Sequence, residues 1–199
     1  MAYHQKSLDE HLANDGKPKR ILSIDGGGLK GVSSLGILQK IEDLLRKRHN
    51  NSDAFCLGHY FDLIAGTSTG AVIAATLATG MRVSEVLEKY MNLGHLVFEK
   101  SFFRKGILRA KYQEEKLNKE LQNVFGAKTQ LGGPEVQTGL LLMTKRLDTG
   151  SPWPISNNPQ GKYYEPRPGE SLEIIPALAG GSCLHRGPFL FQSGNDKDR

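Results

Sequence analysis

Two glycine-rich turns constrain the fold of this 199-residue chain more than any other feature. The first turn, at residues 25–31, follows an apolar run at residues 20–24, and the second, at residues 66–70, follows an apolar run at residues 60–65. A short apolar run that ends at a glycine is typical of a buried strand. Because a stretch with helical character follows each turn, the sequence predicts two strand–turn–helix units.

The second turn has the G-x-S-x-G spacing of a nucleophile elbow, with Gly66, Ser68 and Gly70 at the three defined positions. In such an elbow, small residues allow a sharp turn that lifts the serine hydroxyl out of the sheet. The apolar strand before the motif and the small, apolar residues 70–79 after it favour this interpretation. The simpler alternative is that Ser68 only caps the following helix.

The first turn contains three consecutive glycines, Gly26, Gly27 and Gly28, and opens a helix predicted over residues 32–48. Backbone N–H groups at the start of a helix are suited to hold negative charge. We therefore expect these N–H groups to stabilise the oxyanion of a tetrahedral intermediate formed on Ser68.

The first turn also fits the G-x-G-x-x-G pattern of dinucleotide-binding proteins, through Gly26, Gly28 and Gly31. That pattern requires an acidic residue that binds the ribose at the end of the next strand. Glu42 and Asp43 are near the expected position, but both fall inside the predicted first helix. A nucleotide-binding protein is therefore the less favoured alternative.

The remaining elements also alternate between helix and strand. Helices are predicted at residues 81–93, whose apolar side includes Tyr90, and at about residues 113–124, and a third buried strand is predicted at residues 139–144. This alternation predicts a three-layer α/β/α sandwich with a mostly parallel sheet. In such folds ligands bind beyond the carboxyl ends of the strands, where both glycine turns fall.

The composition argues against several other classes of protein. A net charge of +5 is too small to indicate nucleic-acid binding by itself, and two cysteines, Cys56 and Cys183, form no disulfide framework. No apolar run approaches the roughly 18 residues needed to span a bilayer. Residues 1–20 also lack the apolar core of a signal peptide. We therefore expect a soluble, cytoplasmic protein with no nucleic-acid partner.

A basic segment follows the helix predicted at residues 81–93. Residues 100–119 contain seven basic and two acidic residues, interleaved with aromatic and aliphatic side chains. This composition is typical of a loop that transiently contacts an anionic membrane surface. The alternative is a solvated connection whose aromatic side chains pack on the core.

The two motifs in this order resemble the patatin-like phospholipase family. The resemblance runs from about residue 20 to residue 164 and includes F-D-L-I-A-G-T-S-T-G at residues 61–70 and T-K-R-L-D-T-G-S-P-W at residues 144–153. It implies a patatin-type α/β/α sandwich that hydrolyses acyl esters of phospholipids or galactolipids, and a role in lipid degradation. It also implies a Ser–Asp dyad that needs no metal or organic cofactor.

By this resemblance Ser68 is the nucleophile, and the N–H groups of Gly26, Gly27 and Gly28 form the oxyanion hole. The second member of the dyad is less easily found. In the family it is an aspartate in an Asp-Gly-Gly or Asp-Gly-Ala motif downstream of the serine.

No aspartate of this chain fits that motif. Asp148, Asp196 and Asp198 are the aspartates after residue 100, and none is followed by glycine. We expect His95 and His185 to be structural rather than catalytic. Since a serine without a base is a weak nucleophile, a catalytically dead lipid-binding protein is the main alternative to an active hydrolase.

The end of the sequence suggests why the motif is missing. Residues 174–191 fit no family pattern, but permitted codons read one nucleotide later encode V-R-A-S-T-A-A-P, which resembles the family segment before the dyad aspartate. We hypothesise a frameshift near residues 166–174; a naturally divergent tail is the alternative. Sequencing the locus tests this hypothesis, and downstream DNA without an Asp-Gly motif in any frame would contradict it.

The predicted organisation follows from these observations. Residues 1–19 form a polar N-terminal arm, and residues 20–165 form the N-terminal part of a patatin-like domain whose C-terminal strands are incomplete. Residues 166–199 form an anomalous tail.

Overall fold

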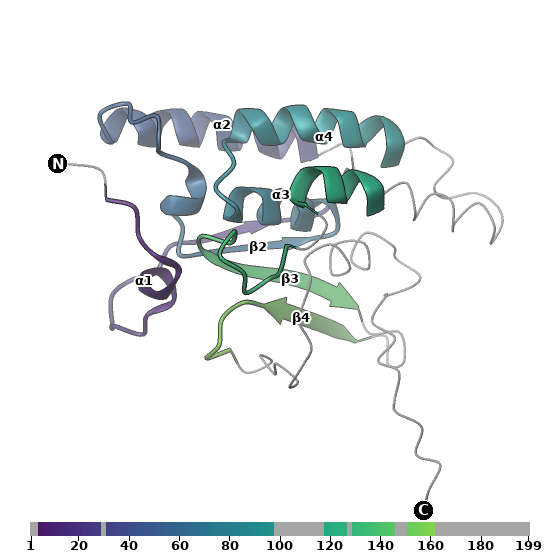
Figure 1. The fold of residues 1–199 in the computed structure, drawn as a ribbon. Coiled ribbons are helices and arrows are strands. Elements are labelled where there is room, and N and C mark those ends of the chain that lie inside the picture. The colour runs from purple at the N-terminus through teal and green to yellow at the C-terminus, as the bar shows by residue number, and fades with distance from the viewer. Residues whose placement is uncertain (1–3, 29–30, 98–117, 127–128, 146–150, 162–199) are drawn as a thin grey trace, which may run out of the picture.

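The computed structural model describes residues 4–28, 31–97, 118–126, 129–145 and 151–161. They form a four-stranded sheet flanked by helices (Figure 1). The strands are β1 (Ile21–Ile24), β2 (Leu63–Thr67), β3 (Gly139–Lys145) and β4 (Pro152–Ser156), in the order β1-β2-β3-β4. The first three strands are parallel and β4 is antiparallel to β3. This mostly parallel α/β architecture confirms the predicted fold class.

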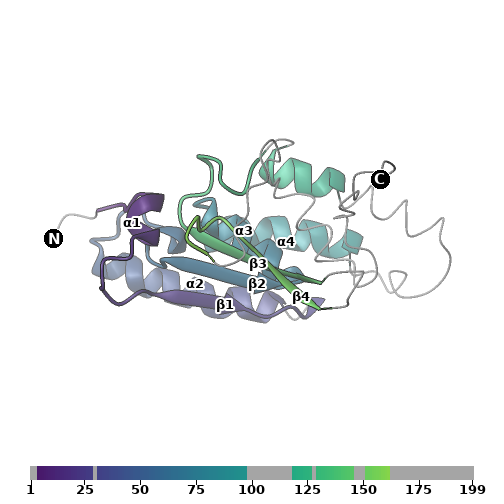
Figure 2. The ribbon, with the colours of Figure 1, turned by 90° about the horizontal axis from the view of Figure 1, so that it is seen from below.

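Three helices cover one face of the sheet, and they lie behind it when the molecule is seen from below (Figure 2). They are α2 (Gly31–Arg48), α3 (Thr69–Ala78) and α4 (Val83–Val97). The short helices α1 (Leu8–Leu12) and η2 (Leu57–His59), and a helical stretch at residues 118–125, complete the described elements. None of the helices in the described ranges is long and apolar enough to cross a bilayer.

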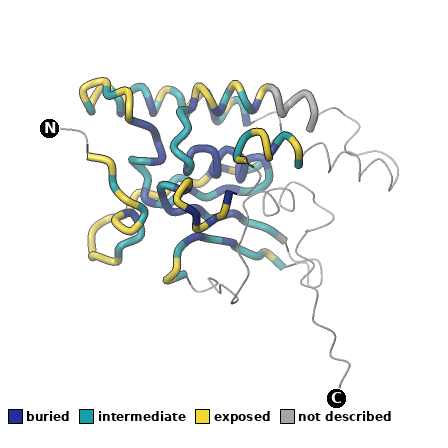
Figure 3. Tube along the Cα trace, viewed as in Figure 1, coloured by how far each residue is buried: buried dark blue, intermediate teal, exposed yellow. Residues whose placement is uncertain are grey.

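The helix α3 forms the centre of the core. All ten of its residues are buried, because their small side chains let the helix lie directly on β2 and β3 (Figure 3). Beneath it the strands alternate: Ile64 and Leu140 are fully buried, whereas Leu63 and Leu141 point to the other face and are half-buried. The buried helix predicted at residues 70–79 is thus confirmed.

The edge strand β4 was not predicted from the sequence. Its sequence contains Pro152 and Pro154, which argue against a strand because proline lacks the N–H that a strand donates to its neighbour. Among the described strands β4 pairs with β3 on one side only, which is where prolines are tolerated.

The N-terminal arm is attached to the amino end of the sheet through Asp62. This residue directly precedes β2 and is 2% exposed. One carboxylate oxygen lies 2.7 Å from Lys6 Nζ and 2.9 Å from Nδ1 of His11 in α1, and the other accepts the backbone N–H of Arg20 at 2.9 Å. A single buried carboxylate therefore holds two points of the arm and the residue that directly follows the arm, Arg20.

Replacing this carboxylate should loosen the arm in a pH-dependent way. Burial by itself would raise the pKa of Asp62, but the hydrogen bonds from Lys6, Arg20 and His11 lower it to about 2. The ionised carboxylate therefore stabilises the fold above a pH of about 4, and this contribution is lost as the pH falls toward 2. We expect Asp62→Asn to lower the free energy of unfolding at neutral pH by about 2 kcal/mol, measured by urea denaturation.

The difference between wild type and Asp62→Asn should shrink over the same acidic range. Asp9→Asn, an equal change of charge at an exposed position of the arm, is the control and should change stability little. Equal effects of the two substitutions would contradict the role of Asp62.

Candidate active site

A single residue separates β2 from α3, and it is Ser68. Its backbone has φ 53° and ψ −125°, a conformation that L residues with side chains rarely adopt. A serine held in this conformation between a strand and a helix has the geometry of a nucleophile elbow. The residue is half-buried, so its side chain is not sealed inside the core.

The two motif glycines of the second turn are required by close backbone packing. A Cβ atom on Gly66 would collide with the carbonyl oxygen of Gly70, and a Cβ atom on Gly70 would collide with the carbonyl oxygen of Ile24. The sharp turn therefore depends on the absence of side chains at both positions. This explains the G-x-S-x-G pattern in physical terms.

The structure brings the first glycine turn against Ser68. A Cβ atom on Gly26 would lie 2.7 Å from Cβ and 3.4 Å from Oγ of Ser68. The N–H of Gly26 donates to Oγ1 of Thr67 at 2.9 Å, and the N–H groups of Gly27 and Gly28 both donate to Oγ1 of Thr69 at 3.2 Å. The three expected oxyanion donors therefore face the two threonines on either side of Ser68.

The structure argues against the capping role that was the simpler interpretation of the serine. The side chain of Ser68 makes no capping hydrogen bond to α3. Its hydroxyl is therefore not used as a helix cap. Both turns lie at the carboxyl ends of β1 and β2, as the fold class predicts for a site.

The acidic residues weighed for nucleotide binding have other partners. Glu42 is 1% exposed, and its carboxylate accepts the N–H of Val83, the first residue of α4, at 3.1 Å. Burial raises the pKa of Glu42. Asp43 accepts a hydrogen bond from Gln39 within α2 at 3.1 Å. Neither carboxylate follows a strand, so the geometry does not favour a ribose-binding site.

Tyr90 is a residue of the site that sequence reasoning missed. It lies on α4 and is 3% exposed, and its hydroxyl donates to the carbonyl oxygen of Gly28. A Cβ atom on Gly31 would collide with the same hydroxyl. The apolar side of the predicted helix located Tyr90 in the core, but no sequence signal connected its hydroxyl to the glycine turn.

The three aspartates after residue 100, Asp148, Asp196 and Asp198, lie outside the described residues. His185 lies outside them too, and the side chain of His95 is not described. The identity of the base is therefore still a prediction.

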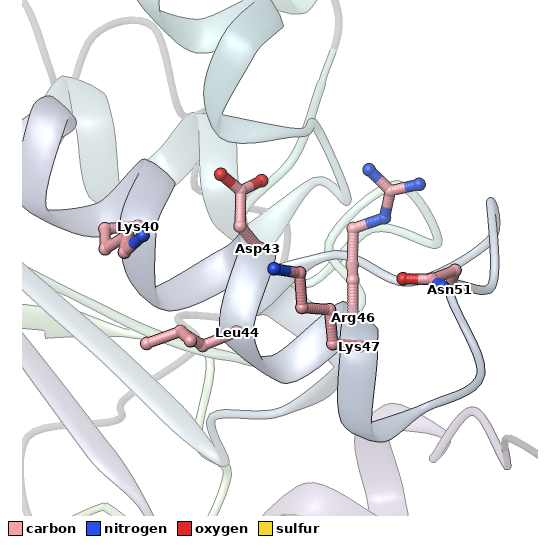
Figure 4. Close-up of a pocket in the computed structure, with 6 residues that line it drawn as sticks. All are labelled: Lys40, Asp43, Leu44, Arg46, Lys47 and Asn51. Carbon is pink, nitrogen blue, oxygen red and sulfur yellow. The ribbon is translucent and has the colours of Figure 1, made fainter.

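Two further features lie apart from the serine. Within the described ranges, no group of three His, Cys, Asp or Glu side chains is arranged to hold a metal ion. A surface hollow of about 300 Å³ lies toward the end of α2 that is far from the glycine turn (Figure 4). Its lining residues are Lys40, Asp43, Leu44, Arg46, Lys47 and Asn51.

Comparison with known proteins adds a family match. A family model described as patatin-like phospholipase matches residues 22–131, which include both glycine turns. A cGAMP-activated phospholipase of Escherichia coli is 30% identical over 141 residues, which cover 68% of this chain and 39% of that protein. A cGAMP-activated phospholipase of Vibrio cholerae is 29% identical over 153 residues, which cover 72% of this chain and 41% of that protein.

Patatin-16 of Solanum tuberosum is 36% identical over 121 residues, which cover 52% of this chain and 31% of that protein. The chain thus spans about two fifths or less of the length of these relatives. Among solved structures, ExoU from the type III secretion system of Pseudomonas aeruginosa, solved with SpcU, matches with a TM-score of 0.47 and 17% identity. That match covers 83% of this chain and 38% of ExoU.

The packing at Gly70 can be tested by a pair of glycine substitutions. Gly70→Ala should lower the free energy of unfolding by about 2 kcal/mol or more, because the new Cβ atom has no space beside Ile24. Gly36→Ala in α2 is the control: it meets no atom within 4 Å and should raise stability by about 0.5–1 kcal/mol. Urea denaturation measures both, and equal stabilities would contradict the close approach of the two turns.

Proposed function

The chain belongs to the patatin-like phospholipase family, and from this membership we propose that it is a lipid acyl hydrolase of the phospholipase A or esterase type. The observation that carries the proposal is the contact between Ser68, at the elbow, and the glycine turn at Gly26. Its substrates would be phospholipids or other acyl esters, and its role would be lipid degradation.

In the proposed reaction the hydroxyl of Ser68 attacks the ester carbonyl carbon, and its proton passes to a carboxylate base. The carbonyl oxygen gains a negative charge, which the N–H groups of the glycine turn stabilise. One such donor typically contributes about 3–4 kcal/mol to the transition state. The leaving alkoxide takes up the proton, and water then hydrolyses the acyl-serine. The reaction needs no metal or organic cofactor.

In this structure the three proposed donors are already hydrogen-bonded to threonine hydroxyls. The N–H of Gly26 lies 2.9 Å from the Thr67 hydroxyl, and the N–H groups of Gly27 and Gly28 lie 3.2 Å from the Thr69 hydroxyl, at the long end of the hydrogen-bond range. A charged oxygen forms shorter and stronger hydrogen bonds than a neutral hydroxyl. In the proposed reaction the substrate oxyanion therefore replaces a threonine hydroxyl as the acceptor.

By the family resemblance, the base we propose is an aspartate followed by glycine, downstream of the serine. None of Asp148, Asp196 and Asp198 precedes a glycine, as the family motif requires. A frameshift near residues 166–174 would account for the missing motif. We therefore expect slow turnover from this chain, because Ser68 without its base is a weak nucleophile.

The outer face of α2 supports contact with a lipid surface. Ile37 and Leu44 are 65% and 51% exposed, and the exposed Lys40 and Lys47 follow each of them by three residues, which places all four on one side of the helix. Figure 4 shows Lys40, Leu44 and Lys47 of this set. Apolar and basic side chains on one helix face are suited to an anionic membrane surface. For the basic segment at residues 100–119 the sequence left membrane contact open beside a solvated connection, and residues 100–117 of it lie outside the described residues.

Labelling of the serine tests the proposed chemistry. We expect a fluorophosphonate probe to modify wild-type protein slowly, and we expect Ser68→Ala to reduce both labelling and ester hydrolysis by at least about a hundredfold. Ser33→Ala, at an exposed serine of α2, is the control and should behave as wild type.

Three results would contradict the proposal in different ways. Labelling that survives in Ser68→Ala would identify another nucleophile. A wild-type protein that binds liposomes but never labels would be a lipid-binding protein without activity. Saturable binding of a dinucleotide would favour the nucleotide alternative.

Charge reversal on α2 tests membrane contact. Lys47→Glu should reduce binding to vesicles that contain phosphatidylglycerol by at least about fivefold, since one basic side chain near an anionic membrane contributes about 1 kcal/mol. Lys17→Glu makes the same change of charge on the N-terminal arm, where the side chain is 79% exposed, and should have a smaller effect. Vesicle sedimentation measures both, and equal losses would indicate a nonspecific effect of net charge.

A further inference from the structure

Two hydrogen bonds connect Gly28 of the glycine turn to the two helices beside it. The N–H of Gly28 donates to Oγ1 of Thr69 in α3 at 3.2 Å, and the hydroxyl of Tyr90 in α4 donates to the carbonyl oxygen of the same Gly28.

Both side chains that bind Gly28 are buried and uncharged. Thr69 is 7% and Tyr90 is 3% exposed. Burial raises the pKa of Tyr90, so its phenol keeps at neutral pH the proton that it donates to Gly28. The N–H and the C=O of Gly28 belong to the two peptide groups on either side of its Cα atom, and each of these groups is restrained by one of the two hydrogen bonds.

Such a restraint matters because this segment has little stiffness of its own. Gly28 has φ 58°, a conformation that glycine adopts at no steric cost, and it follows two further glycines. The direction of the N–H groups in a glycine run is set by external contacts rather than by the chain. Oxyanion donors stabilise a transition state only when they are oriented beforehand.

The packing around the Tyr90 hydroxyl explains why the third position of the G-x-G-x-x-G pattern is a glycine. A Cβ atom on Gly31 would occupy the place of the Tyr90 hydroxyl. Gly26 makes room for Ser68, Gly28 adopts the positive φ, and Gly31 makes room for Tyr90. Each glycine has a role in the elbow site, and none of these roles needs a nucleotide.

We propose that Tyr90 is a positioning residue for the oxyanion donors, acting through its hydrogen bond to the carbonyl oxygen of Gly28. The inference rests on the proposed hydrolase function. It assigns Tyr90 no contact with the substrate: its hydroxyl fixes the backbone at Gly28, on the other side of whose Cα atom the N–H donates to Thr69 beside the elbow.

Tyr90→Phe tests this role in the 199-residue chain, because it removes one hydroxyl and keeps the aromatic side chain packed in the core. With p-nitrophenyl butyrate as substrate, we expect kcat to fall about tenfold or more and KM to stay within about twofold of wild type, since orientation of these donors acts on the transition state. Tyr60→Phe makes the same change at a half-buried tyrosine whose ring lies 4.4 Å from the guanidinium carbon of Arg20. It should leave both constants unchanged.

Amide NMR spectra give a readout that does not depend on activity. In Tyr90→Phe the signals of the Gly27 and Gly28 amides should shift, and these amides should exchange with solvent faster than in wild type. Unchanged amides would overturn the restraint of Gly28 by Tyr90. Changed amides together with an unchanged kcat would overturn the positioning role.

A substitution at Gly31 tests the position of the Tyr90 hydroxyl from the glycine turn. Gly31→Ala should displace the Tyr90 hydroxyl and change the same two amides. The double variant Gly31→Ala/Tyr90→Phe should have a higher melting temperature than Gly31→Ala alone, because the colliding oxygen is gone. Additive losses of stability would contradict the contact between Gly31 and Tyr90.

Failure of the proposed function gives a different pattern. A wild-type chain that neither hydrolyses the ester nor labels at Ser68 would overturn the hydrolase assignment and with it the catalytic meaning of Tyr90. The amide signals and the melting temperatures would still decide whether Tyr90 restrains the glycine turn.

Discussion

The contact between the two glycine turns is the interaction on which the rest of the site depends. Ile24 of β1 is paired in parallel with Gly66 of β2, so both strands end at the same edge of the sheet. Gly70 then packs against the backbone at the end of β1, and Gly26 packs against Ser68. Any side chain at either glycine would separate the turns. The reactive geometry is thus a consequence of backbone packing between neighbouring strands.

The strain at Ser68 is tolerated because the core on either side of it is firmly packed. A residue with a positive φ costs about 1–3 kcal/mol and persists only where its surroundings leave no alternative. Here β2 is paired on both sides, and every residue of α3 is buried. Tyr90 adds a polar restraint from α4, which also packs against α2 and α3. The packed apolar core thus holds in place the polar groups of the site, which lie at the edge of that core.

The segment from Asp62 to Ser68 serves both ends of the sheet. At the amino end, Asp62 gathers Lys6, His11 and Arg20 around one buried carboxylate. At the carboxyl end, the same strand delivers Ser68 to the glycine turn. The charged cluster that attaches the arm is separated from the elbow by the full length of β2, so the arm can be changed without direct contact with the site.

Local patterns in the sequence determined the three parallel strands, the helices that follow the turns and the position of the serine, because strand and helix periodicity and glycine spacing are short-range properties. Only the tertiary structure revealed β4, whose Pro152 and Pro154 are acceptable because in the described sheet the strand pairs on one side only. It alone also joined Tyr90 to Gly28, since a hydrogen bond between α4 and a turn sixty-two residues earlier depends on how the helices pack across the sheet.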